Sequence, residues 1–140
     1  MMSSNDTIET TRIFPVLRYR EAHEMIAWLA RAFGFRRHAV HEDGAGGVAH
    51  AQLAFGSGLI MLSSARDDDF ARRAAPPGGG TAVQTVYIAV DDIDAHHAVA
   101  VATGAEILMP PTDQDYGSRD YICRDPEGNV WCFGTYWPHA

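Results

Sequence analysis

The side chains able to do chemistry are dispersed along this chain and form no known nucleophile or phosphate motif. The sequence has no Gly-x-Ser-x-Gly turn and no Walker-type loop. Its glycine run, Gly78 to Gly80, precedes an expected strand, whereas a phosphate loop opens a helix. Cys132 would need a neighbouring cation to become a thiolate, and the sequence does not place one there. Nucleophilic and phosphate chemistry are therefore not indicated.

Arg119 and the segment before it are better suited to binding. An arginine can hold a carboxylate or a planar anion through two parallel hydrogen bonds. The alternative is a surface ion pair with Asp115 or Asp120, which would contribute little. Residues 110–117 form a long polar connection that carries Tyr116, as expected for a rim or lid over a binding site.

The composition excludes several classes of partner. The 140 residues fit one domain, and 46% of them are hydrophobic, as in soluble globular proteins. Eleven basic and eighteen acidic residues give a net charge of −7, so we expect no binding to nucleic acid or to a membrane surface. No apolar run approaches the roughly 20 residues that span a bilayer. Residues 1–11 are polar and read as a loose lead-in without an export signal.

The two cysteines, Cys123 and Cys132, lie on the arms of a hairpin closed by the turn at Asp125 to Asn129. If Arg124 faces Asn129, the cysteines are diagonal and too far apart for a good disulfide. We therefore expect reduced thiols and a cytoplasmic protein.

The hydrophobic pattern predicts the same order of elements twice. In the first half, apolar residues recur at helical spacing after Glu21 and stop before Gly34. We expect strands there at 12–19, 35–42, 48–55 and 58–63. A linker at 64–80 carries at most one short helical turn. We then expect strands at 84–90 and 105–109, a helix at 92–103, and a closing hairpin at 118–136.

Equal spacing indicates that the two halves are copies. The helix starts Glu21 and Asp92 differ by 71 (92 − 21), the helix-ending glycines Gly34 and Gly104 by 70 (104 − 34), and the glycines expected in the last turns, Gly58 and Gly128, by 70 (128 − 58). Such spacing indicates a duplicated βαβββ unit related by a pseudo-twofold axis. The alternative is an unrelated α+β domain with chance coincidences.

Several short motifs carry a resemblance to a known family. They are Ala32-Phe33-Gly34-Phe35, Val90-Asp91-Asp92-Ile93-Asp94-Ala95, Thr103-Gly104-Ala105-Glu106 and Asp125-Pro126-Glu127-Gly128-Asn129. Together with the duplicated pattern, the chain resembles the vicinal oxygen chelate superfamily, of the glyoxalase/bleomycin resistance protein/dioxygenase-like kind. The resemblance implies an α+β fold in which two βαβββ modules, 12–63 and 81–140, form curved mixed sheets in one structural domain.

The resemblance also implies where a divalent metal would be held. Metal-using members offer His or Glu from four strand positions at the floor of a cup, which correspond here to Phe14, Leu62, Thr85 and Cys132. None is His, Glu or Asp, and a register shift to Met61 or Gln84 would not restore the site. We therefore expect no metal cofactor. A different metal set would have to come from His50, Cys132 and His41.

Strand alternation predicts which side chains face the cup. Val86, Ile88 and Val90, with Trp131 and Phe133, should pack under the helices. Tyr87 suits a core position and a ligand wall equally well, and Trp28 is expected to cover the core. The predicted ligand-binding residues are His50, Gln52, Thr85, Tyr87, Tyr116, Arg119 and Cys132.

We predict a small-molecule-binding protein of the glyoxalase/bleomycin-resistance type, a class that includes antibiotic-resistance proteins. It would hold an aromatic or amphipathic ligand and, by the family's pattern, work as a homodimer. The alternative is a metal-dependent lyase, isomerase or ring-cleaving dioxygenase with an atypical ligand set. A third possibility is a fold kept for an interaction surface.

Overall fold

The structure is a computed structural model that describes residues 11–74 and 84–138. The expected lead-in before Thr11, the end of the linker and the glycine run at Gly78 to Gly80 lie outside the described residues. The elements are β1 (Val16–Tyr19), α1 (Ala22–Phe33), β2 (Arg36–Glu42), β3 (Val48–Phe55), β4 (Gly58–Ser64), α2 (Asp69–Ala74), β5 (Thr85–Ala89), α3 (Ile93–Ala102), β6 (Glu106–Asp113), β7 (Arg119–Arg124) and β8 (Val130–Gly134).

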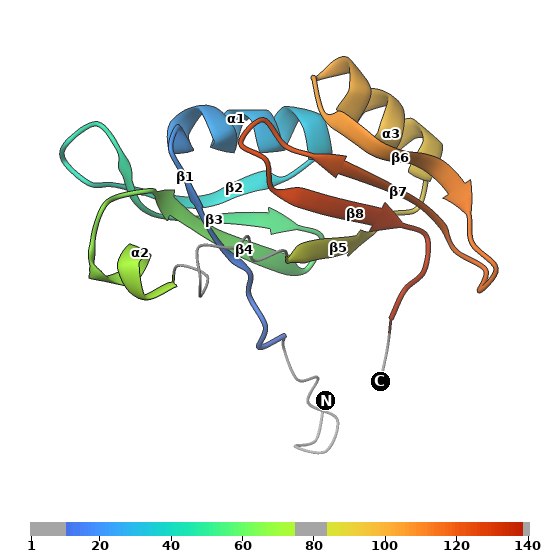
Figure 1. The fold of residues 1–140 in the computed structure, drawn as a ribbon, viewed down its shortest axis with the longest axis horizontal. Helices are drawn as coiled ribbons and strands as arrows, with labels where there is room; N and C mark the ends of the chain where they lie inside the picture. Colours follow the sequence, from blue (N-terminus) through green and yellow to red (C-terminus); the bar gives the residue numbers. More distant parts are fainter. Residues whose placement is uncertain (1–10, 75–83, 139–140) are drawn as a thin grey trace, which may run out of the picture.

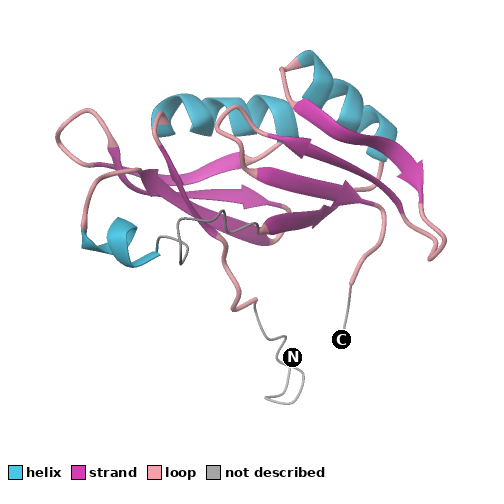
Figure 2. Cartoon of the chain, in the orientation of Figure 1, coloured by secondary structure: helices cyan, strands magenta, loops and turns pink. Residues whose placement is uncertain are grey.

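The strands form two four-stranded sheets with the same topology. The first sheet has the order β1-β4-β3-β2 and the second β5-β8-β7-β6, with one parallel pair in each, β1 with β4 and β5 with β8. Helices α1 and α3 cover the same side of the two sheets, as Figure 1 and Figure 2 show. We call the other side of each sheet its open face. The α+β duplication is therefore confirmed.

The helix side of the sheets holds the core, as strand alternation predicts. Trp131 and Phe133 are fully buried and lie within 5.3 and 4.7 Å of the Phe33 ring of α1, centroid to centroid. Trp28 is 7% exposed, which confirms its expected core position. These rings join the two modules, because α1 belongs to the first and β8 to the second.

Strand β6 is longer than predicted. It continues through Pro110 and Pro111 to Asp113, so the expected loop at 110–117 is reduced to the turn after Asp113. Proline is tolerated there because β6 is the outer strand of its sheet and its pairing with β7 is irregular between Met109 and Thr112.

The closing hairpin differs by one residue from its expected register. Arg124 pairs with Val130, not with Asn129, because the wider turn lets the Asp125 amide donate to the Asn129 carbonyl. Cys123 consequently pairs with Trp131 on the helix side, while Cys132 lies on the open face, and both thiols are free. At the N-terminus, the first strand begins at Val16 and is shorter than predicted. No helix among the described residues is long and apolar enough to cross a membrane.

Candidate functional site

The predicted residues of the first module lie on the open face of its sheet. His50 and Gln52 alternate with Ala51 and Leu53, which are buried beneath α1. The His50 Nε2 is 3.2 Å from the Gln52 amide nitrogen, and the His50 ring stacks at 6.2 Å on that of His41, its partner on β2. The structure therefore brings these three side chains together.

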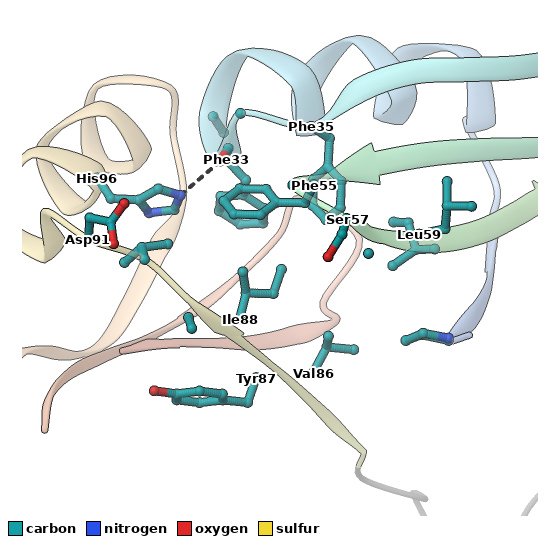
Figure 3. A pocket seen from close by; sticks show the side chains of 18 of the residues that line it. Phe33, Phe35, Phe55, Ser57, Leu59, Val86, Tyr87, Ile88, Asp91 and His96 are labelled. Carbon is teal, nitrogen blue, oxygen red and sulfur yellow. Dashed lines mark hydrogen bonds between the residues drawn. The ribbon is translucent and has the colours of Figure 1, made fainter. Parts of the chain in front are cut away.

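The predicted residues of the second module lie on the open face of the other sheet. Tyr87 pairs with Cys132, and Thr85 with Val130, across the β5–β8 ladder. The Tyr87 hydroxyl donates to the Tyr136 carbonyl at 2.7 Å. Figure 3 shows Tyr87 on the opposite side of β5 from Val86 and Ile88.

A buried carboxylate, Asp120, organises the polar groups near Tyr87. Both of its oxygens accept hydrogen bonds, one from the Ser118 hydroxyl and the other from the Tyr116 hydroxyl at 2.8 Å. A Cβ at Gly134 would clash with Asp120 and with the Tyr87 hydroxyl, so only glycine fits there. The hydrogen bond to Asp120 raises the pKa of Tyr116 to about 12. Asp120 was not among the predicted site residues.

Cys132 is unsuited to nucleophilic chemistry. Burial, and to a lesser extent the Asp120 carboxylate, raise the pKa of its thiol to about 11. The thiol is therefore protonated at neutral pH, whereas a catalytic cysteine needs the thiolate.

Arg119 is held apart from the other predicted residues. Its guanidinium bonds Asp94 of α3 at 3.0 Å and Asp113 of β6 at 3.2 Å. A ligand carboxylate would have to displace these two partners. The structure thus places Arg119 in an ion-pair cluster, with partners other than those expected from the sequence.

The residues at the expected metal positions do not fit a divalent ion. Leu62 is 1% exposed and lies in the core, and its neighbour Met61 takes the open-face position on β4. Phe14 and Thr85 supply no strong donor. Among residues 11–74 and 84–138, no three His, Cys, Asp or Glu side chains are grouped so that they could hold a metal. The absence of a metal cofactor stays a prediction.

A crevice of about 890 Å³ lies at the junction of the two modules. We call it the junction crevice. Val86 and Ile88 of β5 line one wall, and Figure 3 shows them pointing toward Phe33 and Phe55. The alternation on β5 is thus as predicted, but its helix-side residues form a wall of this crevice. Further lining residues are Ile13, Phe35, Ser57, Leu59, Ile60, Val90, Asp91, Asp92, Val99 and Trp137.

His96 of α3 is the main polar group in this crevice. Its Nε2 is 2.8 Å from the Phe33 carbonyl, which can only accept, so Nε2 carries the proton. Its Nδ1 then accepts from the Tyr121 hydroxyl at 2.5 Å. Burial lowers the pKa of His96, so the imidazole is neutral near pH 7. Neutral His96 can present its ring edge to a ligand without adding charge.

Reading the sequence for inward-facing strand residues misses most of this crevice. His96 comes from a helix, Phe33 from a helix end, Phe35 from the connection after it and Phe55 from the end of β3, none of them on the open faces considered there. Tyr87 is the one predicted ligand residue that also borders the crevice. The crevice could have been found from the sequence by comparing the large side chains of one half with their counterparts about 71 residues away in the other half.

Comparison with known proteins identifies relatives. TioX from Micromonospora sp. ML1 is 30% identical, with a TM-score of 0.70, and the match covers 90% of this chain and 100% of that one. The fosfomycin resistance protein FosX from Mesorhizobium loti shares the fold at 13% identity, with a TM-score of 0.65 and coverage of 93% and 94%. A glyoxalase/bleomycin resistance protein from Streptomyces sp. CB03234 does so at 20% identity, with a TM-score of 0.62 and coverage of 86% and 96%.

The curated proteins contain no match to this chain. A family model, in contrast, matches residues 11–133, which include both modules. Together with the duplicated sheets and the TioX match, this shows that the chain belongs to the Glyoxalase/Bleomycin resistance protein/Dioxygenase superfamily.

Proposed function

We propose that this chain is a small-molecule-binding protein that holds an aromatic or amphipathic ligand in the junction crevice without a metal. The observation that carries the proposal is the crevice itself, whose volume of about 890 Å³ is that of a ligand pocket. Phe55 is half-buried and offers a ring on which a flat molecule can pack, while the buried rings of Phe33 and Phe35 support it from the core.

The polar groups of the crevice explain why an amphipathic ligand fits. Asp91 and Ser57 border the apolar walls and could orient a polar group of the ligand, whereas both ring nitrogens of His96 already have partners in the protein. Small-molecule sites commonly combine apolar walls, which give affinity, with a few polar groups, which fix orientation.

The relatives add weight to a binding role. The family's description includes bleomycin resistance proteins, and FosX is described as a fosfomycin resistance protein. Ring-containing antibiotics therefore belong in the compounds to be tested, beside simple planar aromatics.

Thermal denaturation with a panel of planar compounds tests the proposal. A ligand that binds the native state alone must raise the melting temperature, by an amount that grows with its concentration. We expect Ile88→Asn to abolish this shift, because it places an amide in the apolar wall. The matched control is Leu108→Asn, since Leu108 is 44% exposed on β6 and does not line the crevice.

Two results would contradict the proposal. One is a flat response to the whole panel, which would favour a fold kept as an interaction surface. The other is turnover of a substrate that stops with chelator and returns with added metal, which would favour the enzyme alternative.

A further inference from the structure

The two modules can be superposed residue by residue through their strand registers. Leu17 pairs with Leu62 in the first sheet and Ile88 with Phe133 in the second, so the separation is 45 in both (62 − 17 and 133 − 88). Adding 71 therefore converts a position of β1 or β4 into its counterpart in β5 or β8. Gly58 correspondingly matches Asn129, and the turn before Asn129 is one residue longer than the one before Gly58.

One of the two equivalent junctions is filled by large side chains. Tyr19 of β1 is fully buried and donates to Asp125 of the β7–β8 turn at 2.6 Å. Trp131 donates to the same carboxylate at 3.0 Å, and Trp28 of α1 donates to the Thr103 carbonyl at 2.8 Å. The second module is thus locked onto the start of the first by three large rings.

The other junction has small residues at the same positions. The counterpart of Tyr19 is Val90 (19 + 71), that of Trp28 is Val99 (28 + 71), and that of Trp131 is Ile60 (131 − 71). All three line the junction crevice. Ile60 and Val90 are nonetheless buried, and Phe55 takes the position equivalent to Asp125, so the space left by the smaller side chains is open beside Val99.

We propose that the natural ligand is an uncharged planar molecule with two or more fused aromatic rings, which occupies the crevice beside Val99, where the other half of the chain holds the indole of Trp28. This rests on the proposed function and names its ligand class. The ligand rings would pack between Phe55 and the β5 wall, in tilted or edge-to-face contacts like those that Phe33 and Phe35 make with Trp131.

The charges around the crevice disfavour an anionic ligand. Asp91 and Asp92 line it with Arg31, so its lining carries two acidic groups and one basic group, with His96 neutral. At the filled junction, Glu127 accepts from the backbone amides of Arg20 and Glu21. The crevice has the short Ser57 in the equivalent turn. A neutral acceptor on the ligand, such as a carbonyl or ring nitrogen, would serve the polar end of the crevice.

The inference can be tested by placing the large side chain of the filled junction at the equivalent position of the crevice. Phenazine is a suitable probe because it is neutral, planar and tricyclic, and 2-naphthoate is the anionic comparison. We expect Val99→Trp, which restores the Trp28 counterpart, to weaken phenazine binding at least about tenfold in titration calorimetry. Val99 is 49% exposed, so the variant should fold. Val101→Trp is the matched control, because Val101 is 48% exposed on the same helix and does not line the crevice.

The outcomes separate this inference from the proposed function. If the wild type binds phenazine and Val99→Trp binds it equally well, the junction crevice is not the binding site, although a binding function would remain. Tighter binding of 2-naphthoate than of phenazine would refute the uncharged class. If no ring compound binds until residues 1–10 are deleted, that segment is the occupant and the inference fails. Ser57→Glu, on an exposed turn, provides a second plug and should also weaken binding.

Discussion

The most informative single residue is His96, which makes one hydrogen bond across the module junction and one within its own module. Its Nε2–H reaches Phe33 of the first module, and its Nδ1 accepts from Tyr121 of the second. Protonation would make Nδ1 a donor, so the Tyr121 hydroxyl would have to turn round and accept, and a charge would be placed in a largely buried site. His96 is thus a residue whose ionisation opposes the folded arrangement.

We predict that acid destabilises the protein through His96. Burial lowers the folded-state pKa of His96 below its ordinary value of 6.5, so the unfolded chain binds a proton more readily. The free energy of unfolding should therefore hold above about pH 6.5 and fall as the pH decreases toward the folded-state pKa. Urea denaturation between pH 5 and pH 8 measures this dependence.

His96→Gln is the comparison for this pH dependence. Glutamine can keep an N–H near the Phe33 carbonyl but does not titrate. We expect a shallower fall in unfolding free energy below pH 6.5 than in the wild type. The other histidines remain in both proteins, so the difference between the two curves isolates His96. Parallel curves would show that its protonation has no cost.

At the scale of elements, the turn between β7 and β8 caps a helix of the other module. The first residue of α1 follows Glu21, whose own side chain makes no capping hydrogen bond. Glu127 supplies it from the second module, with its carboxylate oxygens 2.7 and 2.8 Å from the amides of Arg20 and Glu21. A carboxylate there also interacts favourably with the positive end of the helix dipole.

We predict that Glu127→Ala lowers the free energy of unfolding by about 1 kcal/mol, the usual cost of losing a helix N-cap. Glu106→Ala is the matched control, because Glu106 is exposed and only pairs with Arg124. Its loss should cost less than about 0.5 kcal/mol. Urea denaturation of the two variants measures both values, and equal losses would show that Glu127 does not cap α1.

Elements were predictable where local pattern determines them. The apolar stripe ending at Gly34 identified α1, and the alternation from Val48 to Phe55 identified β3 with its bounds. Pattern failed in β6, where Pro110 and Pro111 normally exclude a strand, because only the sheet order shows that this strand is at an edge. The partners of Arg119 likewise depend on how α3 lies beside β7, which local sequence does not reveal.

At the scale of the whole molecule, the duplication was predictable because landmarks recur at one spacing. The junction crevice was not predictable in the same way, because strand alternation places a ligand cup on the open faces of the sheets. It arises from differences between the copies, such as Trp28 against Val99, and these matter only once the strand registers are known. The sequence thus does indicate the crevice, but through the positions at which the two copies differ in side-chain size.

The outer strands β1 and β5 lead to the last prediction, which is a homodimer. Each pairs with a single strand, so within the part of the chain that the structure describes one edge of each has no strand partner. Apolar side chains near them are exposed, with Val16 at 63% and two residues that also line the junction crevice, Ile13 at 85% and Trp137 at 60%. Such a patch favours association, and we propose that a second copy covers it.

Light scattering should therefore give twice the mass of one chain, and Val16→Glu should give a monomer, because a charge at the interface must be desolvated on association. Val101→Glu, on the exposed side of α3, is the control and should remain dimeric. Val16 does not line the junction crevice, so the Val16→Glu monomer should still bind phenazine. A wild-type monomer would refute the dimer, and loss of phenazine binding in that variant would show that the partner copy completes the site.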